Sequence, residues 1–214
     1  MTRMRLSLQL VSPLVALLLA PTALRAQGAV PAAGATSTRA APLPDATQIA
    51  LAVLPLPTEF RANANVLGYH AGSPALVSLR AGSGPFTCLA SNPALLNFHV
   101  ACYHTSLEPF MARGRALRAE GVKGDQVDSA RFREVRSGKL RMPAQPAALY
   151  TLTGPTTSVD AKAGTATGAR PLYVVYIPGA TAASTGITAT PAEGTPWIMF
   201  PGTPKAHIMF VPKM

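Results

Sequence analysis

The chain has 214 residues, of which 48% are hydrophobic and only 13% charged, with 21 prolines and 17 glycines. This length accommodates one ordinary domain with accessory segments, and the apolar content excludes a wholly disordered chain. The formal net charge of +10 favours anionic partners over cationic ones.

The first 26 residues predict a secretory signal peptide. A basic start, MTRMR, precedes a 15-residue apolar run from Leu6 to Ala20, and small residues suited to cleavage follow up to Ala26. A membrane anchor is the alternative, but the run is shorter than the ~20 residues that span a bilayer. We therefore expect an exported protein, periplasmic or extracellular, with no transmembrane segment after the signal is removed.

Residues 27–45 are rich in alanine and proline and predict a flexible leader. Residues 46–214 then predict a single domain. Removing the three arginines of the signal leaves 16 basic and 9 acidic residues, a net charge of +7.

The first half of this domain predicts a short helix followed by strands. The segment ATQIALAVL is helical in pattern and is stopped by Pro55 and Pro57. The runs that follow have the β-prone composition and turn signals of antiparallel strands. They cover residues 64–70, 75–81, 86–90 and 100–106.

Cys88 and Cys102 are the only cysteines, and both lie in predicted strands. In an oxidising compartment two cysteines are expected to pair, and neighbouring strands bring such residues within disulfide reach. A redox or metal thiol pair is the alternative, but the chain has no Cys-x-x-Cys motif. We predict one structural disulfide.

Two helices are predicted next, over residues 106–121 and 123–140, with Asp125 as a cap and Gly121 and Gly138 as stops. From Arg113 to Arg141 the chain has nine basic and four acidic residues. A solvated helical face explains such a patch, and binding of an anion or a partner is the functional alternative. Nucleic acid is not expected, because no aromatic residues are interleaved for base stacking. The candidate anion-binding residues are Arg113, Arg115, Arg118, Arg131, Arg133 and Arg136.

Strands return in the last third. Residues 147–154 form one predicted strand, and residues 171–179 are the most strongly β-prone run in the chain. The triplet Ile-Met-Phe occurs at 198–200 and 208–210 around a Pro/Gly connection, as in an antiparallel hairpin. The order of strands, two helices and strands predicts an α+β fold with a mainly antiparallel sheet and two or three helices.

The candidate metal ligands are His207, Met209 and His104. On a strand, His207 and Met209 share one face, and an imidazole with thioethers suits Cu(I). Packing is the alternative role of these side chains. No other cofactor is expected.

Catalytic motifs are missing from the sequence. There is no Gly-x-Ser-x-Gly elbow, no Ser-x-x-Lys start and no phosphate loop, so catalytic residues stay unassigned and binding is favoured over catalysis. The leading hypothesis is an exported, disulfide-braced domain that binds an anionic envelope component or a protein partner. The alternatives are a periplasmic hydrolase whose site assembles only in three dimensions, and a periplasmic copper or metal binder.

Several segments together resemble a family of exported bacterial proteins with no assigned activity. They are LRAGSGPFTCLAS (79–91), VACYH (100–104), RALRAEG, RPLYVVYIPGA (170–180) and PGTPKAHIMFVP (201–212). The resemblance covers roughly residues 46–212 and implies one exported domain with paired cysteines. That family has a histidine where this chain has Leu172, so a site joining such a histidine to His207 does not carry over.

Overall fold

The computed structural model describes residues 40–192 and 194–212, which belong to one unit of the chain, residues 38–214. The predicted signal peptide and residues 27–39 of the predicted leader lie outside the described residues. The sheet is formed by β1 (Asn65–Tyr69), β2 (Leu76–Arg80), β3 (Phe86–Leu89), β4 (Asn97–His104), β5 (Ala147–Pro155), β8 (Arg170–Tyr176), β9 (Trp197–Met199) and β10 (His207–Phe210). The helices are α1 (Asp45–Ala52), α2 (Thr58–Arg61), α3 (Glu108–Ala119), α4 (Asp125–Arg136) and α5 (Ala182–Thr185), with 3-10 turns η1 (Thr105–Leu107) and η2 (Thr156–Ser158). A separate hairpin pairs β6 (Val159–Asp160) with β7 (Thr165–Ala166).

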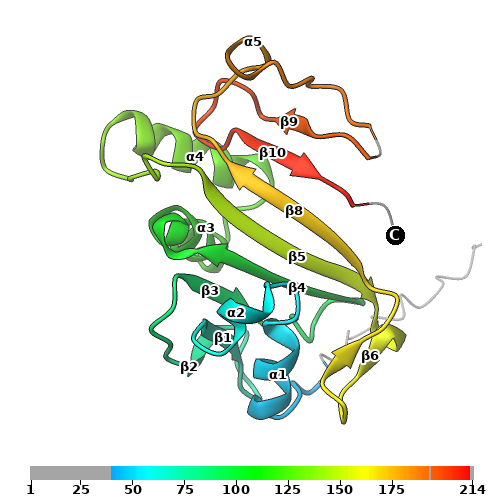
Figure 1. The fold of residues 1–214 in the computed structure, drawn as a ribbon. Helices are drawn as coiled ribbons and strands as arrows, with labels where there is room; N and C mark the ends of the chain where they lie inside the picture. Colours follow the sequence, from blue (N-terminus) through cyan, green and yellow to red (C-terminus); the bar gives the residue numbers. More distant parts are fainter. Residues whose placement is uncertain (1–39, 193, 213–214) are drawn as a thin grey trace, which may run out of the picture. The chain divides into compact units, whose positions relative to one another are not determined.

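The eight strands lie in the order β2-β1-β3-β4-β5-β8-β10-β9 (Figure 1). Every neighbouring pair is antiparallel except β1 and β3, which are parallel. The predicted α+β class with a mainly antiparallel sheet is confirmed. Of the five α-helices in the described residues, α1, α3 and α4 are longer than one turn, in agreement with the expected two or three.

The predicted disulfide is present. Cys88 on β3 lies directly opposite Cys102 on β4, with the two Cα atoms 4.0 Å apart, and both side chains are fully buried. Their sulfurs belong to a cluster formed with α1 and the turn that follows it, including Ala52 and Leu56. The disulfide therefore joins two central strands beneath α1.

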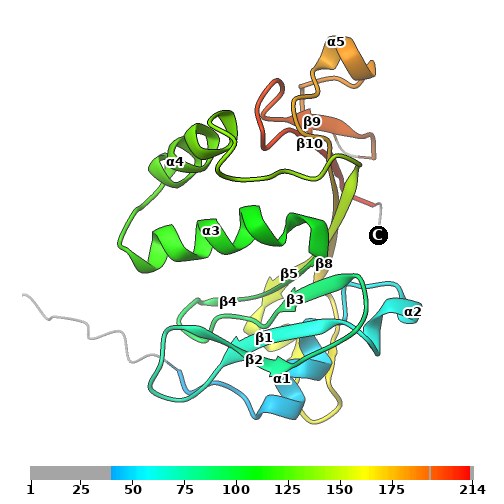
Figure 2. The same ribbon diagram turned by 90° about the vertical axis from the view of Figure 1, so that its left-hand side faces the viewer.

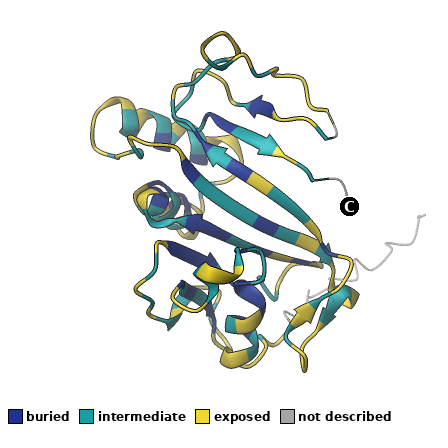
Figure 3. Ribbon diagram, in the orientation of Figure 1, coloured by how far each residue is buried: buried dark blue, intermediate teal, exposed yellow. Residues whose placement is uncertain are grey.

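Helices cover the two faces of the sheet at different places (Figure 2). Because side chains alternate along a strand, Cys102 faces α1, whereas its neighbour Tyr103 faces the other side. There Tyr103, Leu107 and Val174 form a second cluster with Met111 of α3. The most exposed parts of the described chain include α5 and the hairpin of β6 and β7, whereas buried residues concentrate on the inner strands (Figure 3).

The helices α3 and α4 begin and end close to the expected residues. Each is followed by a glycine at positive φ, Gly121 at 88° and Gly138 at 73°, as at many helix C-termini. Asp125 differs from its predicted role: the N-cap of α4 is Gly124, and Asp125 is the first helical residue, where its charge favours the helix dipole.

The two Ile-Met-Phe segments pair as an antiparallel hairpin, with Ile198 opposite Ile208. The residues that join them, 200–206, are called the β9–β10 connection below. In this connection Phe200 has a φ of 52°, the only positive value among described residues other than glycine. No helix in the described part of the chain is both long and apolar enough to cross a membrane.

Candidate functional site

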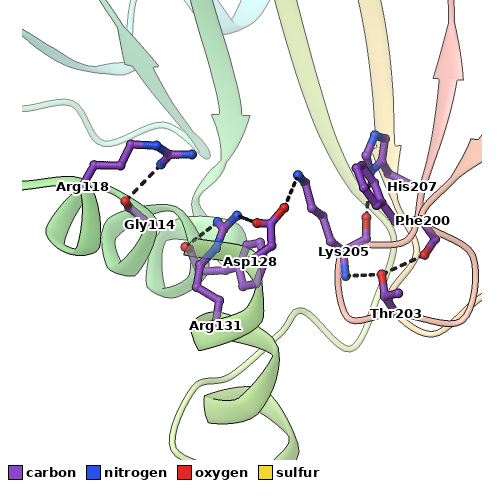
Figure 4. Close-up of polar contacts among 9 residues, drawn as sticks. Gly114, Arg118, Asp128, Arg131, Phe200, Thr203, Lys205 and His207 are labelled. Carbon is purple, nitrogen blue, oxygen red and sulfur yellow. Dashed lines mark hydrogen bonds and ion pairs between the residues drawn. The ribbon is translucent and has the colours of Figure 1, made fainter. Parts of the chain in front are cut away.

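An ion-pair cluster forms where α4 meets the β9–β10 connection. The carboxylate of Asp128, in the first turn of α4, contacts the guanidinium of Arg131 one turn later. Its other oxygen accepts a hydrogen bond from Lys205 Nζ at 2.8 Å (Figure 4). Lys205 is 77 residues away in sequence, so this contact is a tertiary feature that ties α4 to the end of the sheet.

Arg131 occupies a closed position between α3 and α4. Its side chain is only 5% exposed, and its guanidinium lies 3.8 Å from the ring centre of Phe110. Nη1 donates to the carbonyl oxygen of Phe110 at 3.2 Å. Gly114 makes room for this group, because a Cβ there would lie 2.9 Å from Nη1. Arg131 thus fastens the two helices together and is not free for a ligand.

The charges in the cluster do not cancel. Burial alone would raise the pKa of Asp128, but hydrogen bonds from Lys205 and Arg131 outweigh it and hold that pKa below its usual value. Asp128 is therefore ionised at neutral pH between two cations, which leaves one positive charge in excess. The Nε of Arg131 is buried and has no hydrogen-bond partner among the described residues.

The β9–β10 connection is held by its own contacts. Lys205 Nζ lies 4.3 Å from the ring centre of Phe200, and the backbone N–H of Lys205 donates to Thr203 Oγ1 at 3.2 Å. Thr203 Oγ1 in turn donates to the carbonyl oxygen of Phe200 at 2.7 Å. The positive φ of Phe200 is maintained within this network.

His207, the first residue of β10, contacts the backbone of Lys205 on the side of the cluster that faces the sheet. Its Nδ1 lies 2.7 Å from the carbonyl oxygen of Lys205. Because a carbonyl only accepts, Nδ1 carries the hydrogen. Burial lowers the pKa of His207, which favours the neutral ring, so Nε2 has a free lone pair. The ring stacks on Tyr176 with centroids 5.1 Å apart, and burial raises the pKa of Tyr176 to about 12.

A groove of about 380 Å³ continues from the cluster along α4. Positions 128, 132 and 136 follow one another at helical spacing, so the ion pair and the groove share one side of α4. Arg136 is the one charged residue among those that line the groove in the described chain. The lining residues are Phe132, Val135, Arg136, Met142, Pro178, Gly179, Gly202, Thr203 and Pro204.

The predicted basic patch is partly neutralised inside the protein. Arg113 bonds both carboxylate oxygens of Glu134 and also contacts Glu120. Arg115 pairs with Glu108. Arg113, like Arg131, therefore joins α3 to α4, whereas Arg115 pairs within α3 and also donates to Tyr103 Oη on β4 at 2.8 Å.

The remaining arginines of the patch are exposed. Arg118 donates to the carbonyl oxygen of Gly114 at 3.0 Å. Arg133 and Arg136 form no ion pair with any carboxylate of the described residues. Arg118 forms no such ion pair either, so three of the six predicted residues keep their charge unpaired, and of these only Arg136 lines the groove.

The structure does not bring the three predicted metal ligands together. His207 and Met209 share one face of β10, with Met199 directly opposite His207. His104 lies on the other face of β4, three strand spacings away, or about 14 Å. Its Nδ1 accepts the backbone N–H of Ser106 at 3.2 Å and caps η1. The described residues contain no group of three or more His, Cys, Asp or Glu side chains that could hold a metal ion.

Two histidines contact hydroxyl groups, which bears on the hydrolase hypothesis. His104 Nδ1 lies 2.8 Å from Ser106 Oγ, and His99 Nδ1 lies 2.7 Å from Thr153 Oγ1 on the adjacent strand. Neither pair lines the groove or the second cavity described next. Both are explained by capping and cross-strand contacts, so they supply no nucleophile in a cleft.

A second cavity of about 320 Å³ lies on the α1 side of the sheet, beside β6. Sequence reasoning missed it, because its walls come from segments far apart in the chain. The only sequence signal was the pair Leu95 and Leu96, which follows the turn at Asn92 and Pro93 and lies outside the predicted strands and helices.

A comparison of the chain with protein-family models, with curated proteins and with solved structures found no match.

Proposed function

We propose that this protein is an exported binding protein that holds an anionic ligand with an apolar portion in the groove along α4. The observation that carries the proposal is Arg136: it is exposed, has no carboxylate partner in the described chain, and lies in an otherwise uncharged groove.

The chemistry of the groove defines the ligand class. A guanidinium presents paired N–H donors that match a carboxylate or phosphate, and such charge-assisted bonds are among the stronger polar contacts. Phe132, Val135 and Met142 supply apolar walls. A ligand with an acidic group and a hydrocarbon portion uses both features, as an anionic envelope lipid would.

The surrounding charge supports the same ligand class. Beyond the paired arginines, the exposed basic residues near the end of α4 are Arg133, Arg136, Lys139 and Arg141. Cations in the last turn of a helix also favour the helix dipole. That effect explains the charge at position 136, while the apolar groove around it is what indicates a ligand. Binding is favoured over catalysis, because no His, Cys, Asp or Glu of the described residues lines the groove, and the hydroxyl of Thr203 is engaged by Phe200 and Lys205.

Titration with dodecyl phosphate, followed by isothermal calorimetry, tests the proposal. Arg136→Gln should weaken binding about tenfold, the scale of one charge-assisted hydrogen bond. The matched control is Arg133→Gln, which removes the same charge from the same helix outside the groove and should change the affinity less than about twofold. Equal losses in the two variants would mean general charge attraction, and no loss in Arg136→Gln would contradict the proposal. Inorganic phosphate should bind more weakly than dodecyl phosphate, because it lacks the apolar portion.

Binding of Cu(I) is a second candidate function. It is favoured by the hydrogen bond from His207 Nδ1 to the carbonyl oxygen of Lys205, because the neutral ring then carries an unprotonated lone pair on Nε2. Metal-bound histidines commonly donate their other ring N–H to a carbonyl in this way, and Met199 lies opposite His207. Titration with Cu(I) should raise the melting temperature of the wild-type protein. His207→Asn should abolish that rise and His104→Asn should not, whereas an unchanged rise in His207→Asn would contradict a site at this residue.

A further inference from the structure

The cavity on the α1 side of the sheet, called the apolar pocket below, has a floor of core side chains. Leu51 of α1 and Phe98 of β4 are each only 3% exposed and belong to the cluster beneath the pocket. Val159 of β6 supplies another wall. These residues are parts of regular elements, so the shape of the pocket is set by the packed sheet and helix and not by a loop alone. Figure 1 shows α1 and β6 together, at the end of the fold away from α4.

No charged residue lines the apolar pocket. Its lining residues are Ala40, Ala41, Pro42, Leu43, Gln48, Leu51, Ala90, Ser91, Asn92, Pro93, Leu95, Asn97, Phe98, Thr156, Val159 and Ala161. The buried polar group among them, Gln48, is fully used: Nε2 donates to the carbonyl oxygens of Leu43 and Tyr69, at 2.7 and 2.8 Å. Its Oε1 accepts the N–H of Tyr69 at 2.9 Å.

The satisfied amide of Gln48 has two consequences. It fixes the backbone at Leu43, which forms one wall. It also leaves the floor with no orphan donor or acceptor, since the two unpartnered buried polar atoms among the described residues, on Arg131 and Trp197, do not line this pocket. The other polar side chains of the lining, those of Ser91, Asn92, Asn97 and Thr156, are half-buried or exposed and do not belong to the buried floor. A floor without unpartnered polar groups favours apolar contents over water.

The size of the pocket limits the ligand. A cavity of about 150 Å³ lined by apolar side chains is known to hold benzene, and the apolar pocket, at about 320 Å³, has roughly twice that volume. A hydrocarbon group of about ten carbons therefore fits.

The rim of the pocket carries apolar side chains that face solvent. Leu43 is 40% exposed and Leu95 is 57% exposed, and both line the pocket. A bound hydrocarbon would remove part of this surface from water, which is favourable in proportion to the area covered. Leu96, at 92% exposed, is adjacent in sequence but does not line the pocket.

We propose that the apolar pocket is a binding site for an uncharged hydrocarbon group of about ten carbons, carried by a free small molecule or by a lipid. The site is separate from the groove along α4: the lining residues differ throughout, and no arginine or lysine is available here to hold an acidic group. The proposal does not depend on the ligand of that groove.

The test measures fluorescence of N-phenyl-1-naphthylamine with the full mature chain, followed by displacement with 1-decanol. The probe should gain fluorescence on binding, and decanol should displace it. Phosphatidylcholine vesicles, followed by co-sedimentation, form a separate arm. Retention of the protein on vesicles together with displacement by decanol assigns the group to a lipid chain, whereas displacement without retention assigns it to a free molecule.

Two matched pairs of variants locate the site. Ala161→Phe places a ring at the pocket mouth, whereas Ala163→Phe makes the same change at an exposed position of the same turn outside the lining. The first should weaken probe binding at least tenfold and the second should not. Leu95→Asn should weaken binding about fivefold, from the loss of a partly buried leucine contact, whereas Leu96→Asn should leave it unchanged.

All four positions are exposed or at the surface, so the variants should fold, and their thermal unfolding checks this. Absence of probe binding to the wild-type chain would overturn the proposal. So would equal losses in Ala161→Phe and Ala163→Phe. A larger loss in Leu96→Asn than in Leu95→Asn would overturn it as well, because the loop tip and not the pocket would then make the contact.

Discussion

Replacing Asp128 with asparagine removes the only carboxylate that pairs with Arg131 in the described part of the chain. The side chain of Arg131 is only 5% exposed, and its guanidinium is held against Phe110 of α3 by a hydrogen bond and a ring contact. Removing one partner of a buried ion pair costs about 3–5 kcal/mol, since an uncompensated charge is left behind. Because the side chain of Asp128 is itself 20% exposed, we expect the lower end, about 3 kcal/mol.

Urea unfolding followed by tryptophan fluorescence measures this change. Trp197 is the only tryptophan and is 8% exposed, so it reports on the end of the sheet beside the cluster. With a slope of about 2 kcal/mol per molar urea, the midpoint should fall by about 1.5 M. The loss should shrink as the pH falls below about 4, because a carboxyl whose folded pKa is depressed contributes stability above its unfolded value and loses it on protonation.

Two further variants separate the buried charge from general effects of substitution. Lys205→Met leaves the pair of Asp128 and Arg131 intact and should cost at most about 1 kcal/mol. Combining Asp128→Asn with Arg131→Met should recover part of the loss, since no buried charge then remains unpaired. A loss below 1 kcal/mol in Asp128→Asn, or no recovery in the double variant, would refute the account of Arg131 as a buried clamp.

Three other outcomes follow from single features of the fold. Replacing Cys88 and Cys102 together with alanine should lower the free energy of unfolding by about 3 kcal/mol, the loop-closure value for this separation, and a reducing agent should lower wild-type stability equally. Gly114→Ala should destabilise by about 1 kcal/mol, although alanine in a helix usually gains about that much, because the new Cβ would meet Arg131; a gain in urea stability would contradict this. In His207→Asn, the rise of stability with pH should flatten below pH 6.5. Burial lowers the pKa of His207 in the folded state, so the neutral ring contributes its full stability above the unfolded pKa of about 6.5, and this stability declines as the pH falls towards the folded pKa. An unchanged slope in His207→Asn would contradict this account.

Most helices and strands could be predicted from the sequence because the signals for them are local. The helices α3 and α4 end shortly before glycines that the sequence marks as stops, and most of the β-prone run at 171–179 forms β8. The disulfide followed from there being only two cysteines. By contrast, the parallel pairing of β1 with β3 has no local signal, and neither does the position of β8 between β5 and β10.

The candidate site could be predicted only in part, because the contacts that form it join residues far apart in the sequence. His207, Arg131 and Arg136 were singled out from composition and spacing, but their partners were not. Asp128 and Lys205 meet only because the β9–β10 connection returns to α4. The apolar pocket combines residues from position 40 to position 161, so no window of sequence contains it.

Local sequence signals were enough to place the three longer helices and the eight strands of the main sheet, but not α2, α5 or the hairpin of β6 and β7. The sequence also predicted that the cysteines pair and that positive charge accumulates between Arg113 and Arg141. Which of those charges are available depended on the tertiary structure. Arg131 and Arg133 are two positions apart, which on a helix is a rotation of about 200°. One therefore points into the contact with α3 and is paired, and the other points into water. Charge is a property of composition, whereas its neutralisation depends on which groups packing brings within bonding distance.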